Sequence, residues 1–168
     1  ITRFDPTNFK TKFACEVKNF DPLAYFDRKE AKKLDMFAQF AIIAAEQAVN
    51  DAKFDLEKID HDRVGVVWGA GIGGLNTFLE EVRGYVEGGS VPRFNPFFIP
   101  KMIADIASGH ISMKYGFRGP NFGTVSACAS STNALADAYN LIRLGKADVF
   151  IAGGSEASIN EAGVGGFN

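Results

Sequence analysis

The sequence lacks most of the features that would assign it to a specialised protein class. Cysteine is scarce, with two residues among 168 (Cys15 and Cys128), which are too few for a disulfide framework and favour a reducing, cytoplasmic compartment. Positive charge is not in excess, since 18 Lys and Arg face 20 Asp and Glu, so nucleic acid is not expected as a partner. No apolar run approaches the roughly 18 residues that span a membrane. The first residues contain no apolar core of a signal peptide.

The remaining composition is typical of a globular domain, with 46% hydrophobic and 23% charged residues. Apolar residues recur at helical spacing in four segments, 29–52, 75–86, 101–115 and 134–142. Continuous apolar runs at 64–68 and 147–152 predict strands buried on both faces, and a short β-leaning run precedes Cys128. Residues 1–29 are loop-rich, with an extended piece expected at 13–17. The resulting order is helix, strand, helix, helix, strand, helix, strand, which indicates an α/β layered fold with parallel crossovers.

The segment around Cys128 is the candidate for chemistry. It reads Thr124-Val-Ser-Ala-Cys-Ala-Ser-Ser131, and then enters an apolar-periodic run that starts with helix-capping residues. Cys128 is therefore predicted where a strand stops and a helix begins. The free N–H groups of a helix start favour a thiolate, and a sharp turn exposes the side chain as a nucleophile elbow does. The alternative is that Cys128 is a small buried hydrophobic residue, as most free cysteines are.

A glycine-rich loop follows the first predicted strand. Gly69, Gly71 and Gly74 match the pattern G-x-G-x-x-G between a strand and a helix, which is the pattern of a dinucleotide-phosphate loop. A dinucleotide-binding unit also needs a second strand ending in an acidic residue about 20 residues later. Residues 88–96 contain a turn and no such strand. The alternative is that these glycines let the backbone pass close to another group, such as an acyl chain.

The remaining reactive residue types receive no catalytic role from their positions. His61 lies among charged residues in a connector and is expected to be solvated, with no second metal ligand near it. His110 falls on the apolar side of the 101–115 helix and is expected to be a core histidine with one hydrogen bond. Cys15 is interpreted as a residue of an extended segment. Residues 96–100 are expected to form a rigid aromatic loop, and 163–168 a glycine-rich turn.

Several motifs together resemble one enzyme family. The run 124–131, preceded by Tyr115-Gly-Phe-Arg-Gly-Pro120, resembles the nucleophile segment of β-ketoacyl-acyl carrier protein synthases. Four further segments match the same family in the same order: 71–75, 95–100, 147–156 and 163–167. The greatest similarity is to the chain-elongating synthase II type of bacterial fatty acid synthesis, and it extends from Phe4 to Phe167.

The resemblance implies a thiolase-like fold, in which two similar α/β halves stack in five layers. Residues 1–168 would form most of the N-terminal half, a mixed sheet layered between helices. The first strand and the whole C-terminal half, with the family's histidine pair, would lie outside this sequence. The chain does not begin with Met and ends in a glycine-rich stretch, so we expect it to be a piece of a longer protein.

The resemblance also implies an acyltransferase reaction and its residues. Cys128 would accept an acyl group from acyl carrier protein, and decarboxylation of malonyl-carrier protein would drive a Claisen condensation that lengthens the chain in fatty acid elongation. No cofactor is expected, because the substrates travel on the 4'-phosphopantetheine arm of acyl carrier protein. The implied substrate-binding residues are Ile72, Phe98, Gly163 and Phe167. Phe98 would act across a homodimer, and Lys32 and Lys33 would contact the acidic carrier protein, although a solvated helix face is an equal reading of these lysines.

Three other functions stay open at this point. A polyketide-type ketosynthase would share the motifs. A non-catalytic partner of the chain-length-factor kind would also share them, although such partners typically lack the cysteine. A dinucleotide-binding domain using Gly69–Gly74 is the least favoured. Without the histidine pair, the 168-residue chain alone is expected to be inactive in condensation.

Overall fold

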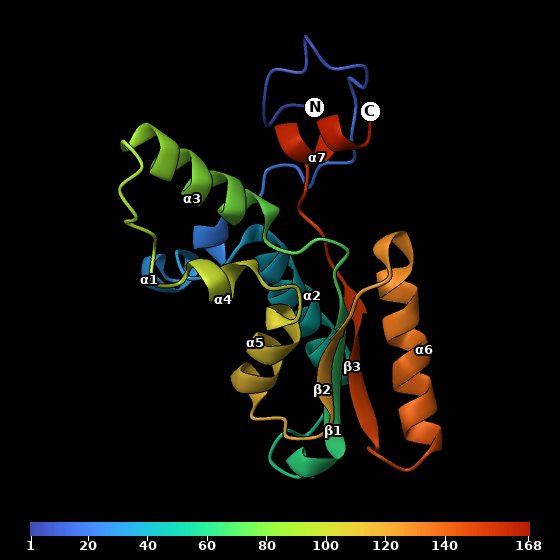
Figure 1. Cartoon of the computed structure of the whole chain (residues 1–168). Helices are drawn as coiled ribbons and strands as arrows, with labels where there is room; N and C mark the ends of the chain where they lie inside the picture. The colour runs from blue at the N-terminus through green and yellow to red at the C-terminus, as the bar shows by residue number, and fades with distance from the viewer.

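The computed structural model describes all residues, 1–168, as a parallel sheet with helices on both faces (Figure 1). The strands are β1 (Val64–Gly69), β2 (Asn121–Thr124) and β3 (Val149–Gly154), in the spatial order β2-β1-β3. Both neighbours run parallel to β1, so the sheet in this chain is parallel rather than mixed. All six residues of β1 are buried, as expected for a central strand covered on both faces.

Helices α2 (Met36–Ala52) and α5 (Ile106–Tyr115) cover one face of the sheet, and α6 (Ser130–Arg143) covers the other (Figure 1). The α2 side holds most of the core. It includes the completely buried Phe37 and Ile111, which pack against Val64 and Val66 of β1. The outward face of α6 carries exposed apolar side chains, namely Leu135, Tyr139 and Ile142. None of the helices combines the length and the apolar character that crossing a bilayer requires.

The helix expected at 29–52 is two helices, α1 (Arg28–Ala31) and α2. The prediction of one helix was wrong because Asp35 is a buried N-cap. Its carboxylate accepts hydrogen bonds from Phe37 N and, across the fold, from Thr77 N and Oγ1. An N-cap residue adopts extended dihedrals, which ends the preceding turn.

The helix expected at 101–115 is likewise divided into α4 (Phe98–Met102) and α5, because Ile103 has an extended backbone conformation. The aromatic segment 96–100, expected to be a loop, supplies most of α4. Residues 13–17 form no strand, since they have no strand neighbour to pair with in this chain. Helix α3 (Leu75–Glu87) follows the glycine loop as predicted.

The C-terminal residues, expected to be a turn, form a short helix, α7 (Glu161–Gly166). Asn160 caps it, because its side-chain oxygen accepts a hydrogen bond from Gly163 N at 2.8 Å. The N-terminal segment lies beside α7 at the end of the chain (Figure 1), where Thr11 N donates to the Asn168 side chain at 3.1 Å. Both termini therefore lie beyond the carboxyl ends of the strands.

Candidate active site

Three loops leave the sheet on the same side, at the carboxyl ends of its three parallel strands. The register pairs Gly69, the last residue of β1, with Thr124 of β2 and Gly154 of β3. Ligands of open parallel sheets bind beyond this edge. The glycine loop, the Cys128 turn and the segment after β3 therefore meet.

Cys128 lies in a single helical turn, η3 (Ala127–Ala129), between β2 and α6. Ala127 has a φ of 50°, a left-handed conformation that costs a non-glycine residue free energy and marks a tightly constrained turn. Ser130 holds this turn, because its Oγ accepts from Ser126 N at 2.9 Å and donates to Ala127 O at 2.7 Å. The thiol of Cys128 is exposed and free, so the reading of Cys128 as a buried hydrophobic residue is wrong.

Two glycines let the start of α6 pack against the strand ends. A Cβ on Gly69 would lie 2.5 Å from the backbone of Ser130, and one on Gly154 would lie 2.7 Å from the Ser131 Cβ. Both distances are shorter than any real Cβ contact, so these positions accept only glycine without a shift of the backbone. Because neither residue has a side chain, the start of α6 packs directly against the strand ends, and this packing fixes the turn that presents Cys128.

Cys128 opens into a cavity of about 380 Å³, a size that suits a small ligand or part of an extended one. The cavity is also lined by the glycine loop, with Gly71 and Ile72, and by Glu156 and Ser158 after β3. Phe167 also lines the cavity, although this residue is largely exposed to solvent. The backbone N–H of Cys128 donates to no other group of the chain. An unpaired N–H beside a nucleophile can stabilise an oxyanion.

The other predicted substrate residues lie outside this cavity. Gly163 is buried in α7 and lines a neighbouring cavity of about 360 Å³, which Cys15 and Phe167 also line. Phe98 begins α4 and stacks on Phe94, with ring centroids 5.6 Å apart. The structure therefore brings Ile72 and Phe167 to Cys128, but not Gly163 or Phe98.

Lys32 and Lys33 are exposed just after α1 and line no part of the cavity. The ammonium of Lys33 lies 5.2 Å from the Phe97 ring centroid, a cation–π distance. Neither lysine forms a salt bridge. Their charges are thus available on the surface.

The expectation that His61 is only solvated was wrong. Its Nε2 lies 2.8 Å from Leu56 O and its Nδ1 lies 3.2 Å from Gly116 O, so the ring joins two loops below the sheet. His110 is half-buried on α5, and burial lowers its pKa. The His110 ring makes no hydrogen bond within the chain, whereas one hydrogen bond was expected from the sequence. No three His, Cys, Asp or Glu side chains come together closely enough to hold a metal ion.

Several backbone donors of the glycine loop and of the first turn of α3 are already paired within the chain, and a carboxylate lies against the loop. Gly74 N donates to Met102 O, and Thr77 N, in the first turn of α3, donates to the buried Asp35 carboxylate. Ile72 N donates to the Glu156 carboxylate at 2.7 Å. A carboxylate in this position repels a phosphate, so the structure disfavours the dinucleotide alternative.

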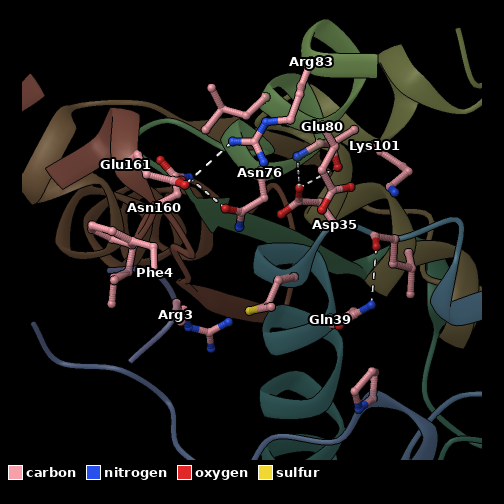
Figure 2. Close-up of a pocket in the computed structure, with 16 residues that line it drawn as sticks. Arg3, Phe4, Asp35, Gln39, Asn76, Glu80, Arg83, Lys101, Asn160 and Glu161 are labelled. Carbon is pink, nitrogen blue, oxygen red and sulfur yellow. Dashed lines mark hydrogen bonds and ion pairs between the residues drawn. The ribbon is translucent and has the colours of Figure 1, made fainter. Parts of the chain in front are cut away.

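A second hollow of about 440 Å³ lies between α2, α3 and the segment before α7 (Figure 2). Several of its polar groups are paired with one another: Asn160 donates to Asn76 Oδ1 at 2.7 Å, and Arg83 lies 3.7 Å from Glu161. Asp35 binds Thr77 in the same hollow. It is larger than the Cys128 cavity but has no nucleophile, and its bonds connect helices to one another.

Sequence reasoning missed Glu156 as a site residue. A detectable signal was present, because Glu156 follows a buried strand almost directly, and the loops after adjacent parallel strands meet at one edge. Ser130 was also missed, although it holds the turn through two hydrogen bonds.

Known proteins match this chain along its whole length. The family model described as the N-terminal domain of beta-ketoacyl synthase matches residues 3–168. The 3-oxoacyl-[acyl-carrier-protein] synthase 2 of Staphylococcus aureus is 42% identical over 168 residues, which are 100% of this chain and 41% of that relative. The enzyme of the same name from Synechocystis sp. is 44% identical over 167 residues, which are 99% of this chain and 40% of that relative.

Solved structures agree on the fold. A type II polyketide synthase ketosynthase, solved in complex with its acyl-carrier protein, is 26% identical with a TM-score of 0.80, over 89% of this chain and 42% of that chain. The ishigamide ketosynthase/chain length factor has a TM-score of 0.85 at 24% identity, over 97% of this chain and 41% of that chain, and supports the thiolase-like fold alone. The chain thus spans about two fifths of the relatives it matches, and it belongs to the β-ketoacyl synthase family.

Proposed function

We propose that residues 1–168 are the nucleophile-bearing, N-terminal half of a 3-oxoacyl-acyl carrier protein synthase of fatty acid elongation. The observation that supports this most directly is the exposed thiol of Cys128 on a constrained turn, facing a cavity with Ile72 in its wall. The 42–44% identity to synthase 2 enzymes favours fatty acid elongation over polyketide synthesis, since the polyketide ketosynthase is 26% identical.

The reaction would begin with acyl transfer. The Cys128 thiolate attacks the carbonyl carbon of an acyl thioester carried by acyl carrier protein. A bond forms between Sγ and this carbon, and the thioester bond to the phosphopantetheine sulfur breaks; this sulfur leaves as a thiol by taking up the proton that Cys128 lost on forming the thiolate. The backbone N–H of Cys128, which is free in this chain, faces the developing oxyanion.

Condensation would follow on the same cysteine. Malonyl-acyl carrier protein loses carbon dioxide, and the resulting carbanion attacks the acyl carbonyl on Cys128. The carbon–sulfur bond breaks, the thiolate is restored, and a 3-oxoacyl chain two carbons longer remains on the carrier. The groups that would assist decarboxylation are not in this chain, so it supplies the nucleophile and part of the acyl wall.

The proposal includes partners and a compartment. Acyl carrier protein would deliver both substrates, and the charges of Lys32 and Lys33 suit its acidic surface. Phe98 lies away from Cys128 within one chain, which agrees with a role across a homodimer interface. We place the full-length enzyme in the cytoplasm. Gly163 would shape the neighbouring cavity that shares Phe167 with the Cys128 cavity.

The test uses the full-length protein with acyl- and malonyl-acyl carrier protein. Mass spectrometry should find the acyl group on Cys128, and Cys128→Ala should remove both the adduct and at least about 10³-fold of the condensation rate. Cys15→Ala is the matched control and should retain both. An acyl adduct on Cys15, or condensation that survives Cys128→Ala, would contradict the proposal. The 168-residue chain alone should yield no 3-oxoacyl product.

A further inference from the structure

Glu156 connects the segment after β3 to the glycine loop after β1. Its Oε2 accepts a hydrogen bond from Ile72 N at 2.7 Å, across 84 residues of sequence. Its Oε1 accepts from Ser158 Oγ at 2.8 Å, which orients the carboxylate. Hydrogen bonds to an ionised acceptor are stronger than neutral ones. The carboxylate therefore acts as a bridge between two walls of the Cys128 cavity.

The glycine loop depends on this bridge because little else fixes its middle. Ile72 N donates to no other group, and it is flanked by two glycines, Gly71 and Gly73, the latter at a φ of 80°. The next fixed point is Gly74 N, which donates to Met102 O at 3.0 Å. Without the carboxylate, residues 70–73 would have no hydrogen bond to a side chain.

Glu156 also sets how close the loop comes to the nucleophile. A Cβ on Gly71 would lie 3.3 Å from Glu156 Oε2 and 3.4 Å from the Ala127 carbonyl oxygen. The loop is thus held between the carboxylate and the residue before Cys128. Any movement of the loop away from Glu156 shifts Ile72 relative to the thiol.

We propose that Glu156 is a positioning residue for acyl-chain length, and this rests on the proposed condensing function. It acts through Ile72: the carboxylate holds the loop in one place, and the Ile72 side chain then forms a fixed wall for long acyl chains. Short chains make fewer contacts with this wall than long ones, so their reaction depends less on Glu156. The effect is one of substrate selection rather than of chemistry at Cys128.

The experiment measures kcat and KM of the full-length enzyme with a short primer, hexanoyl-acyl carrier protein, and a long one, tetradecanoyl-acyl carrier protein. Glu156→Ala should raise KM for the long primer about tenfold relative to KM for the short primer, with kcat measured for both. Glu156→Gln keeps an acceptor oxygen and should restore the parent ratio to within about threefold. Glu161→Ala, which removes an exposed carboxylate outside the cavity, is the matched control and should behave as the parent.

The outcomes separate the two proposals. Long-to-short selectivity that is unchanged in Glu156→Ala, while Ile72→Phe changes it, would overturn the role of Glu156 and leave the function intact. A loss of short-primer activity that Glu156→Gln does not restore would also overturn it. If Glu156→Ala fails to fold, Glu156→Asp decides, because its shorter carboxylate should give the same shift in selectivity. A parent protein that condenses neither primer would instead refute the proposed function.

Discussion

The carboxyl and amino ends of the parallel strands differ in the residue types that form their loops. The carboxyl end has glycines at the last position of β1 and β3, a strained turn at Ala127 and an exposed thiol. At the amino end, η2 (His61–Arg63) leads into β1, and charged side chains close the loops. Arg63 binds Asp148 through two hydrogen bonds of 2.6 and 3.1 Å, and Arg118 pairs with Asp62.

The two ends also differ in how many of their loop backbone N–H groups are hydrogen-bonded within the chain. At the amino end, Arg118 N donates to His61 O and Asp148 N donates to Arg63 O, so loop atoms are paired with one another. At the carboxyl end, the N–H of Cys128 is left free and a cavity replaces packing. We infer that the amino end stabilises the fold while the carboxyl end provides chemistry, which predicts that substitutions at the two ends change different observables.

The largest effect at the carboxyl end, after loss of the nucleophile, is expected for Ile72→Phe in the full-length enzyme. The added ring volume fills the cavity wall, and overpacking a fitted site costs about 2 kcal/mol, or roughly thirtyfold in rate for the longest primers. Short primers should react at the parent rate. The measurement is the distribution of product lengths, with thermal unfolding as a check on stability.

Ile72→Val serves as the control for Ile72→Phe, because it alters the same wall without adding volume. Elongation of long primers by Ile72→Phe at the parent rate would show that the acyl chain does not pass this residue. A fall in stability that equals the fall in activity would remove the contrast between the two ends of the sheet.

The order of elements and the Cys128 turn could be predicted because their signals are local. Buried strands are continuous apolar runs, and a helix start follows Cys128 within a few residues. The break before α2 could not be predicted, because the partner that buries Asp35 is Thr77, which is 42 residues away. A run of apolar residues at helical spacing across 29–52 hides such a cap.

The residues of the candidate site likewise fall into those that a local motif predicts and those that depend on contacts between distant segments. Motif resemblance predicted Ile72 and Phe167, and the structure places both at the cavity. Glu156 depends on a contact with Ile72 that no local pattern contains, since the parallel pairing of β1 and β3 creates it. His61 was misjudged for the same reason: the carbonyl groups that its ring faces come from two separate loops.

At the amino end, His61→Ala should lower stability without affecting the reaction. The ring bridges Leu56 O and Gly116 O and packs against Phe117, with centroids 5.6 Å apart. Loss of these contacts should lower the free energy of unfolding by about 1 kcal/mol. Denaturant unfolding measures this, and acylation of Cys128 should be unchanged. A variant with parent stability and slowed acylation would reverse the assignment of the two ends.

The smallest effect is expected for Asp148→Asn, and it should depend on pH. The side-chain hydrogen bond from Arg63 holds the pKa of Asp148 below its ordinary value; desolvation opposes this, and the charge of Arg63 adds to the lowering. A carboxyl group whose pKa is lower in the folded state stabilises the fold above its unfolded pKa of about 3.9, and this contribution is lost as pH falls through the folded value. Parent and Asp148→Asn should therefore differ at pH 5–8, by less than His61→Ala, and converge as the pH falls below the lowered pKa of the folded state. Both side chains of the pair are partly exposed, so added salt should also shrink the difference in stability.

Thermal unfolding across pH measures this difference between parent and Asp148→Asn. Glu57→Gln, which changes an exposed carboxylate without a partner, is the matched control. A difference that persists unchanged at low pH would show that Asp148 acts through packing rather than through its charge.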